Sequence, residues 1–421
     1  MKIIAITGTK GKTTITRALS YVISRQGEKT LRVDTDGYYI NEKQRGNLSE
    51  SLKLFGLVPT VCPGKYLIAM KKSFPDFTAI LETALGCSRR AGLGYASHNI
   101  GIFSNVLEDH LGSTKRLKKR SDIAKAKQFI FTAVKKNGTL IFNADDKHVC
   151  SQLKYIPKSS LVTLLPIGLK FRFFDLKKHL SLGGQAITIK DACVIIKTKE
   201  KIKKIINPSE ISWTFNGAFQ PSLYNLMFIL GGIYAYTNNK ITKKQLADLK
   251  KYKLAKFGGR LTILENKKTN VKIIIDFAHE KYSLVEIGKL AKKLSTRKTI
   301  GIVRLAPDRT SKMLFETGQF IANSFDDLIV YDKIDGINRK VYKGHDLIPD
   351  RHPGDISKIF LEGILSKKTS GRAEQIIIEE SAIKKAATLA SSGDIVVVIC
   401  GKDHKKTIGY VKKYFNASFT Q

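Results

Sequence analysis

The sequence predicts an α/β protein of two domains: a first with a mostly parallel central sheet and a small antiparallel insert, and a second that is Rossmann-like. Its 421 residues exceed the size of one usual hydrophobic core. Across residues 1–165, short apolar strands alternate with helical stretches, which is typical of a parallel sheet built from βα repeats. The same alternation returns after residue 270. We therefore expect one domain at 1–257 and another at 258–421.

The first strand is expected at residues 1–7, where MKIIAIT is almost wholly apolar. A glycine-rich turn follows it, and residues 15–24 then carry apolar side chains at helical spacing. Later elements of this domain are expected as strands at 79–81, 99–104 and 139–142 and as helices at 123–134 and 217–237.

Residues 166–215 predict the antiparallel insert, because short alternating segments are divided there by Gly and Asn turns. The segments expected to be strands are FRFFDL, QAITIKD, CVIIKTK and ISWTF.

The second domain is expected to begin after a glycine break, FGGR at 257–260, which follows a basic helix and resembles a hinge. Beyond this break, apolar strands separated by helices are expected at 271–275, 299–303, 328–331, 375–378 and 395–399.

The formal net charge of +37 is large enough to suggest a polyanionic partner. However, the lysines are spread along the whole chain without aromatic interleaving, and no nucleic-acid-binding signature is present. We therefore favour solvated lysines on an ordinary monomeric enzyme over a nucleic-acid partner. No apolar run reaches the length of a membrane span, and the chain starts on a strand, so we expect neither a membrane anchor nor a signal peptide. Five cysteines without a C-x-x-C pair indicate free thiols in a reducing cytoplasm.

The segment GTKGKTT at 8–14 lies between the first strand and its helix, and this context predicts a site for nucleotide phosphates. Glycines let backbone N–H groups surround an anion, the helix N-terminus adds its positive end, and Lys12 adds a charge. Thr13 offers a hydroxyl to Mg²⁺. Ile6 stands where the general P-loop has its first glycine. The alternative, a glycine turn that only caps a helix, explains neither the Lys nor the Thr after Gly11.

Polar residues follow other strands of the first domain at the edge where α/β folds bind ligands. Glu82 ends one strand and is a candidate oxygen ligand for Mg²⁺. His110, in SNVLEDHLG, is a candidate imidazole metal ligand, although alone it would be interpreted as a polar loop residue. NADD at 143–146 follows a third strand and, taken alone, could be only a turn.

Together these segments resemble the Mur ligase superfamily. GTKGKTT is similar to the family's G-T-x-G-K-T/S loop, NADD to its N-A-D-D, and LETALG, RRAGLG and SNVLEDHLG to the Mur-type half of cyanophycin synthetase. Lys127 falls where the family has a lysine carbamylated by CO₂, which would supply a carboxylate-like ligand for a second Mg²⁺. Lys125 is the neighbouring alternative, and in isolation Lys127 would be interpreted as a surface lysine of a helix.

The resemblance also implies an ATP site that draws on both domains. Asn225 matches the last residue of a G-x-H-N-x-x-N segment, although Gln220 and Pro221 replace its His-Asn. The second domain contributes residues in GRL, DFAH and PDR segments, which are similar to G-R-M/L, D-Y-A-H and G-x-R/D-R. The implied nucleotide-binding residues are Gly8, Thr9, Lys10, Gly11, Lys12, Thr13, Thr14, Asn225, Arg260, Asp276, His279 and Arg309.

The incoming amino acid is expected in the second domain. Arg339 is the candidate for its carboxylate, and Lys402 and His404 lie in GKDH, which is similar to the family's G-K-G-H. Mur ligases begin with a domain that holds a UDP-sugar, whereas here the phosphate loop directly follows the first strand. We therefore expect that domain to be absent, and the acceptor to be held by the two domains present, another polypeptide or a surface such as 34–63.

The resemblance thus implies a cytoplasmic ATP-dependent amide ligase that works through an acyl phosphate, with Lys12, Lys127, Glu82 and His110 as catalytic residues and two Mg²⁺ ions. Our first expectation for the reaction is addition of an amino acid to a UDP-linked peptide precursor of cell-wall pseudomurein, in an archaeal setting. A cyanophycin-like or poly-γ-glutamate ligase is the alternative within the class. A nucleic-acid-stimulated P-loop NTPase, suggested by the charge and the loop, is the alternative from another class.

Overall fold

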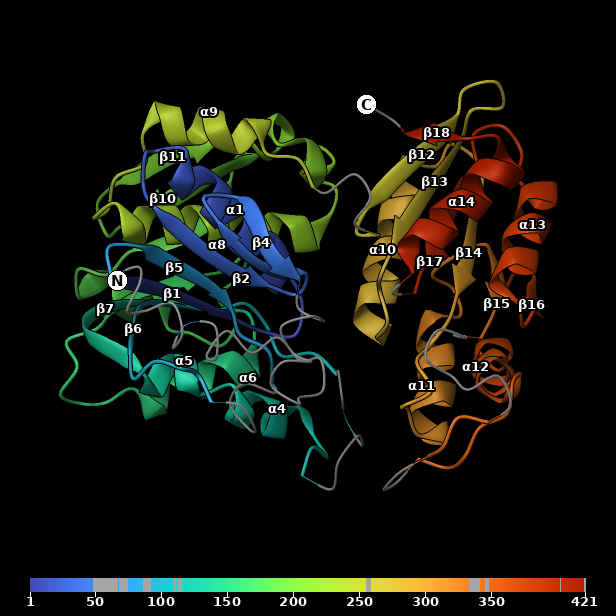
Figure 1. Cartoon of the computed structure of the whole chain (residues 1–421), viewed down its shortest axis with the longest axis horizontal. Coiled ribbons are helices and arrows are strands. Elements are labelled where there is room, and N and C mark those ends of the chain that lie inside the picture. Colours follow the sequence, from blue (N-terminus) through green and yellow to red (C-terminus); the bar gives the residue numbers. More distant parts are fainter. Residues whose placement is uncertain are drawn as a thin grey trace. The chain divides into compact units, whose positions relative to one another are not determined.

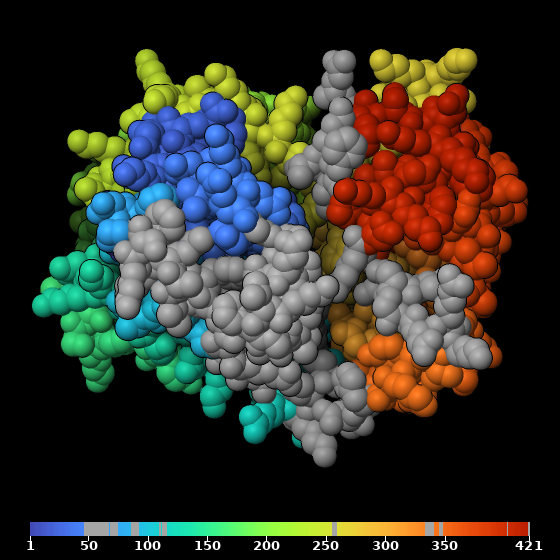
Figure 2. Space-filling model, in the orientation of Figure 1, coloured from blue at the N-terminus to red at the C-terminus, as the bar shows by residue number. Residues whose placement is uncertain are grey.

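The computed structural model describes residues 1–47, 67, 75–85, 92–108, 111, 116–254, 259–332, 341–344, 348–401 and 403–419 (Figure 1). The chain divides into two compact units. Unit 1 comprises Met1–Leu107 and Lys119–Tyr252, and unit 2 comprises Glu108–Lys118 and Lys253–Gln421. Apart from 108–118, the described surface of unit 1 runs from blue to yellow-green and that of unit 2 from yellow to red (Figure 2). The predicted boundary between 257 and 258 lies outside the described residues.

Unit 1 is built on an eleven-stranded sheet with the order β11-β10-β9-β8-β7-β6-β1-β5-β2-β3-β4. Its centre is parallel, because β1 pairs in parallel with both β5 and β6, and the parallel pairing continues to β2 on one side and through β7 and β8 on the other. The strands are β1 Lys2–Thr7, β2 Thr30–Asp34, β3 Gly37–Ile40, β4 Lys43–Asn47, β5 Thr78–Glu82, β6 His98–Phe103, β7 Val134–Asn143, β8 Thr163–Ile167, β9 Ala186–Lys190, β10 Cys193–Lys197 and β11 Ile202–Ile206.

Helices cover both faces of this sheet (Figure 1). One layer is α1, α8 and α9, in which α1 contacts both α8 and α9. The other layer holds α4, α5 and α6, and α5 contacts β1, β6 and β7. Because both faces are covered, the central strands are apolar throughout, as in β1, where Ile3 to Thr7 are all buried. The helices are α1 Lys12–Ser24, α4 Arg120–Ala126, α5 Phe129–Thr132, α6 Lys147–Cys150, α7 Leu176–Ser181, α8 Gln220–Tyr236 and α9 Lys243–Lys251.

The expected insert at 166–215 is an extension of the same sheet. Strands β9, β10 and β11 pair antiparallel, and β9 joins the main sheet through β8. Two expected strands are wrong: FRFFDL is a turn leading into α7, where Asp175 caps the helix by accepting the Lys178 amide at 2.9 Å, and ISWTF contains a 3₁₀ turn. Strand β11, which the sequence did not predict, lies in the lysine-rich run and is an edge strand with exposed Lys203 and Lys204.

Unit 2 is built on a seven-stranded sheet with the order β16-β15-β14-β17-β13-β12-β18. The strands from β16 to β13 are parallel, and β12 runs antiparallel to both β13 and β18. The strands are β12 Thr262–Asn266, β13 Val271–Asp276, β14 Thr299–Val303, β15 Asp327–Val330, β16 Ala373–Gln375, β17 Ile395–Ile399 and β18 Ser418–Phe419. The helices are α10 Lys281–Leu294, α11 Ser311–Ile321, α12 Asp355–Leu365, α13 Glu379–Leu389 and α14 His404–Phe415.

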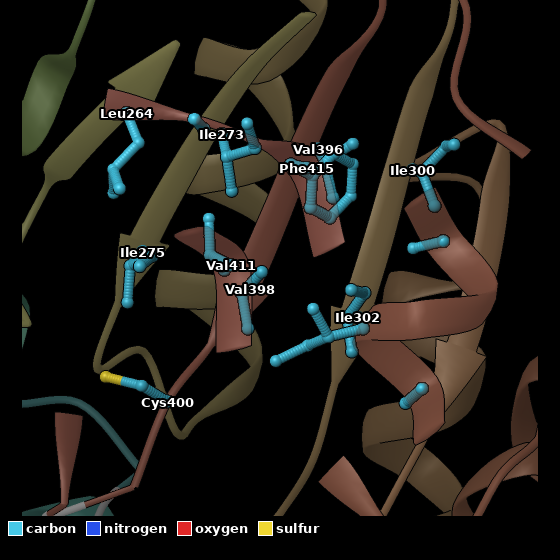
Figure 3. Packing of buried hydrophobic residues seen from close by; sticks show 14 of the residues in the cluster. Leu264, Ile273, Ile275, Ile300, Ile302, Val396, Val398, Cys400, Val411 and Phe415 are labelled. Atoms are coloured by element: carbon cyan, nitrogen blue, oxygen red, sulfur yellow. The ribbon is translucent and has the colours of Figure 1, made fainter. Parts of the chain in front are cut away.

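Alternate residues of neighbouring strands form the core on one face of this sheet. Ile273 and Ile275 of β13 and Ile300 and Ile302 of β14 point to the same face of the sheet (Figure 3). Helices α13 and α14 cover this face, and Val411 of α14 packs into the cluster. The helices α10, α11 and α12 contact one another in sequence and pack outside this cluster. Two helical layers therefore enclose a mostly parallel sheet, which is the predicted Rossmann-like arrangement.

The direction of chain travel reverses between β14 and β17. From β14 the chain goes on to β15 and β16, whereas from β17 it goes to β18 on the other side of the sheet. In open α/β sheets such a switch point opens a crevice at the carboxyl ends of the strands, where ligands bind.

None of the described helices is both long and apolar enough to cross a membrane.

Candidate functional site

The loop after β1 requires glycine at two positions. Gly8 and Gly11 have φ values of 147° and 85°, which lie in the region that favours glycine. A Cβ on Gly8 would lie 2.0 Å from the Ser104 hydroxyl oxygen, and a Cβ on Gly11 would lie 2.3 Å from Oδ1 of Asn225. The loop therefore packs tightly against the end of β6 and against α8, and the predicted nucleotide residue Asn225 lies beside it.

Lys12 folds back over this loop. Its Nζ donates to the carbonyl oxygens of Gly8 and Thr9, each at 3.0 Å. It therefore places a positive charge at the same point as the start of α1, whose first-turn N–H groups have no partner within the helix. Both features favour an anion there, as the sequence predicted for a phosphate loop.

Asn105 fixes the loop, a role that the sequence did not reveal. Its Oδ1 accepts the amides of Thr9 at 3.1 Å and Lys10 at 2.9 Å, and its Nδ2 donates to the Lys10 carbonyl at 3.1 Å. Ser104 adds a hydroxyl donated to the same carbonyl at 2.8 Å. In this state the amides of Thr9 and Lys10 are bound to Asn105, so the anion-facing amides belong to the start of α1.

A chain of oxygen atoms connects the loop to β5. The Thr13 and Thr35 hydroxyl oxygens lie 3.3 Å apart, and Thr35 donates to the Glu82 carboxylate, 3.2 Å from each oxygen. Thr13 and Glu82 are 4% and 3% exposed, whereas Thr35 is exposed. The two residues predicted to hold Mg²⁺ are thus brought together, and Thr35, which the sequence did not single out, connects them.

An ion-pair cluster holds the turn that carries Thr35. The buried carboxylate of Asp34 accepts from Arg17 of α1 at 2.8 Å, pairs with Arg32, and accepts the Asp36 amide at 2.9 Å. Burial opposes the charge of Arg17, but Asp34 and Asp36 raise its pKa above the ordinary value. The turn is therefore fixed to the helix that follows the phosphate loop.

Lys127 lies beneath the same loop. It is 3% exposed, and its Nζ lies 3.4 Å from the Thr7 hydroxyl oxygen, which in turn donates to the Thr83 carbonyl at 2.9 Å. The interpretation of Lys127 as a surface lysine is therefore wrong, whereas Lys125 is exposed. A buried amine beside the carboxyl ends of β1 and β5 is positioned to face the loop.

NADD is more than a turn. The Asn143 amide donates to the Ser104 carbonyl at 2.9 Å, and Asp146 accepts the Val106 amide at 2.7 Å. Asp145 accepts the Tyr224 hydroxyl of α8 at 2.7 Å. Although burial favours its neutral form, hydrogen bonds from Tyr224 and three backbone amides lower the pKa of Asp145. These contacts hold the segment after β6 that contains Asn105.

Unit 2 brings several predicted residues to the carboxyl edge of its sheet. Asp276, at the end of β13, accepts the Leu261 amide at 2.9 Å and so holds the segment that contains Arg260. A Cβ on Gly259 would lie 2.7 Å from Cβ of His404, so α14 begins against this segment. The polar edge is therefore assembled from residues that are far apart in sequence.

A small cavity in unit 2 holds two further predicted residues. It is lined by His279, Lys281, Arg309 and Glu108, among others. Lys281 pairs with Glu108 at 2.7 Å, and the buried Arg309 donates to the neighbouring Asp308 carboxylate at 3.0 Å. Two further glutamate side chains also line it, so cationic, imidazole and acidic groups share one cavity.

Three predicted site residues, His110, Arg339 and Lys402, lie outside the described residues, as does Gly258 of the expected hinge. In the part of the chain that the structure describes, no three His, Cys, Asp or Glu side chains form a metal site. Mg²⁺ needs no such cage, because it is commonly held by one or two carboxylates together with substrate phosphates and waters. The hydroxyl of Thr13 and the carboxylate of Glu82 fit that donor set.

Comparison with known proteins shows which family this chain is similar to. Residues 6–199 match the Mur ligase middle domain. Residues 6–199 thus carry a Mur ligase middle domain, and over almost its whole length the chain has Mur ligase and cyanophycin synthetase homologues. This match confirms the resemblance predicted from GTKGKTT and NADD. In the structure, both segments form hydrogen bonds to residues that directly follow β6.

Two sequence relatives extend the match over almost the whole chain. A cyanophycin synthetase from Nostoc sp. is 26% identical over 399 residues, which are 94% of this chain and 41% of that protein. The chain thus spans about two fifths of the length of the cyanophycin synthetases that it matches. A UDP-N-acetylmuramoyl-L-alanyl-D-glutamate–2,6-diaminopimelate ligase from Clostridium acetobutylicum is 25% identical over 433 aligned positions, which cover 100% of this chain and 78% of the ligase.

Solved structures share the Mur ligase fold. A pseudomurein peptide ligase type C from Methanothermus fervidus has a TM-score of 0.62 at 16% identity and covers 98% of this chain and 78% of its own. A bifunctional folylpolyglutamate synthase/dihydrofolate synthase from Yersinia pestis, complexed with AMPPNP and Mn ion, has a TM-score of 0.67 at 14% identity and covers 97% and 88%. At these identities the likeness establishes the fold, and it confirms the predicted α/β class.

Proposed function

We propose that this chain is an ATP-dependent amide ligase that joins an amino acid to a carboxylate acceptor through an acyl phosphate. The observation that carries the proposal is the placement of Lys12, Thr13 and Glu82 around one phosphate loop, with Thr35 between the last two. A loop that binds phosphate and holds hard oxygen ligands suits transfer of the γ-phosphoryl group of ATP.

In the first step an oxygen of the acceptor carboxylate attacks the γ-phosphorus, which gives an acyl phosphate and ADP. The γ-phosphoryl oxygens carry negative charge throughout, so donors that are already oriented lower the barrier. Lys12 supplies one such donor when its Nζ leaves the carbonyls of Gly8 and Thr9 for a phosphate oxygen. The first-turn amides of α1 supply others.

Mg²⁺ would be held by Thr13 and Glu82, where it would neutralise phosphate charge. We propose that Lys127 carries a carbamate, whose oxygens would serve a second Mg²⁺. Its burial beside Thr7 supports this, because burial disfavours the charged, unmodified form of a lysine amine. The bound nucleotide and metal named for the Yersinia pestis structure agree with an ATP and divalent-metal requirement.

In the second step the amine of the amino acid attacks the acyl carbon, and phosphate leaves with the acceptor's oxygen. We assign the amino acid to the carboxyl edge of the sheet in unit 2, and we propose Asp276, His279 and Arg309 as nucleotide-binding residues. We propose a Mur ligase central domain at 1–257 and a C-terminal domain at 258–421. Exclusion of water matters here, because water would hydrolyse the acyl phosphate.

For the acceptor we propose a UDP-linked peptide precursor of a murein-like wall. The names of the Clostridium acetobutylicum and Methanothermus fervidus relatives support this choice. A cyanophycin-like ligase is the second candidate, because the cyanophycin synthetases match 94% of the chain at 24 to 26% identity.

The test is ADP release by the purified protein over twenty amino acids, with UDP-linked peptides in one series and an aspartate- or glutamate-containing peptide in another. Release that requires both acceptor and amino acid supports the ligase, and the preferred series identifies the acceptor. Release that depends on RNA or DNA and on no amino acid would reject the ligase in favour of a nucleic-acid-stimulated NTPase.

A further inference from the structure

Arg304 is a buried arginine whose hydrogen-bonding capacity is mostly unused. It is the first residue after β14 and is 1% exposed. Its Nη2 donates to the Cys400 carbonyl, just beyond β17, whereas its Nε and Nη1 have no hydrogen-bond partner among the described residues. Buried polar groups are nearly always paired, so two unpaired donors on one guanidinium call for an explanation.

No internal group of the described part of the chain supplies the missing anion. Arg304 forms no ion pair there, and the ring centroid of Phe277 lies 5.6 Å from its guanidinium carbon. Cys400 stays a neutral thiol, because burial raises its pKa to about 12. A buried charge that is neither paired nor fully hydrogen-bonded is unfavourable.

The position of Arg304 indicates what kind of partner is missing. Arg304 follows β14 and bonds to the residue after β17, and these two strands flank the point where the sheet of unit 2 reverses direction. That point is where α/β sheets bind ligands. Asp276, which ends the next strand, β13, holds the Gly259–Leu261 segment at the same edge.

We propose that Arg304 binds a carboxylate of the amino-acid substrate at the β14/β17 switch point. The planar guanidinium matches a carboxylate, and its two unpaired nitrogens supply the donors that such a ligand requires. The proposal rests on the proposed ligase function for the identity of the ligand. The carboxylate is either the α-carboxylate or a side-chain carboxylate.

The variants for the test are Arg304→Met, Arg304→Lys and Arg297→Met. Arg297 precedes β14 at the opposite edge of the sheet, where it is half exposed and pairs with Asp394 at 3.5 Å. Its substitution therefore removes the same charge at a distance from the proposed site and serves as the control. Arg304→Lys retains the charge without the planar fork. Thermal unfolding of each variant establishes whether it folds.

The measurement is calorimetric binding of L-glutamate, L-alanine and inorganic phosphate to the full chain in the presence of Mg²⁺ and ADP. We expect Arg304→Met to weaken amino-acid binding by roughly 10- to 100-fold, Arg304→Lys to weaken it less, and Arg297→Met to leave it unchanged. Loss confined to glutamate assigns the side-chain carboxylate, and equal loss for alanine assigns the α-carboxylate.

Removal of an unpaired buried charge should not lower the unfolding temperature, so a large fall for both Arg304 variants would show a structural role and overturn the proposal. Unchanged amino-acid binding by Arg304→Met, a selective loss of phosphate or ADP binding, or no binding of either amino acid to the wild-type protein would also overturn it. Because binding is measured without turnover, an absence of amide formation in the ligase assay rejects the proposed function separately.

Discussion

The Thr35 hydroxyl lies 3.2 Å from both oxygens of the Glu82 carboxylate, across 47 positions of sequence. The same hydroxyl oxygen lies 3.3 Å from that of Thr13. One exposed threonine on a fixed turn therefore lies between the two buried side chains that we propose as Mg²⁺ ligands.

Replacement of Thr35 should weaken metal binding. Thr35→Val preserves shape but removes both contacts, and we expect about 10- to 150-fold weaker Mn²⁺ binding in the presence of ADP, which corresponds to loss of one hydrogen bond to a charged group. Thr35→Ser is the matched control and should bind nearly as well as wild type. Electron paramagnetic resonance of free Mn²⁺ measures both, and equal affinities for the two variants would exclude the role of Thr35.

Gly11 should be essential for a reason that Gly27 does not share. Both have similar φ values, 85° and 88°, but a Cβ on Gly11 meets Asn225 Oδ1 at 2.3 Å, whereas one on Gly27 meets nothing within 4 Å. Each Ala substitution should lower stability by about 1 kcal/mol through backbone strain. Only Gly11→Ala should also abolish binding of a fluorescent ADP analogue; its retention would show that the loop and α8 need not be in contact.

Lys127 and Lys125 offer a test of carbamylation. Lys127→Ala should lose activity and regain part of it when acetate or formate is added, because a small carboxylate can occupy the vacated space. Lys125→Ala should behave as wild type, since that side chain is exposed. Incorporation of ¹³CO₂, followed by carbon NMR, should give a carbamate signal in wild type and in Lys125→Ala. A signal that persists in Lys127→Ala would assign the carbamate elsewhere.

The buried His98 should make the protein acid-sensitive. Burial lowers its pKa from 6.5 to about 4, so the unfolded chain takes up a proton at higher pH than the folded chain does. The stability that His98 contributes is complete above pH 6.5 and is lost as the pH falls through 4, by about 3 kcal/mol.

Chemical denaturation of wild type and His98→Gln at several pH values between 4 and 7 measures this contribution. The free energy of unfolding should fall less steeply in the variant, because glutamine does not titrate. Parallel curves would show that other groups set the acid sensitivity.

Much of the fold follows from local sequence, because strands covered on both faces are continuous apolar runs. The strands β1, β14 and β17 were predicted within a residue or two for this reason. FRFFDL was misassigned because its aromatic residues suggest a strand, whereas Asp175 caps a helix there. Edge strand β11 was missed because its lysines face solvent.

The residues of the site could be predicted only where they belong to a recognisable sequence motif. GTKGKTT and Glu82 could be assigned from pattern and resemblance, but Thr35 and Asn105 could not. Asn105 acts on amides 95 and 96 positions away, and the contacts of Thr35 exist only once β2 and β5 are paired. Such roles depend on tertiary packing, which no local sequence pattern encodes.

The central claim is that an acceptor carboxylate receives the γ-phosphoryl group before the amide forms. The most direct test uses an acceptor peptide labelled with ¹⁸O in the reacting carboxylate, turned over with ATP, Mg²⁺ and the preferred amino acid. Mass spectrometry of the released phosphate should find one ¹⁸O atom for each amide formed, because phosphate leaves with the acceptor's oxygen. Unlabelled phosphate accompanying amide formation would contradict the acyl-phosphate mechanism.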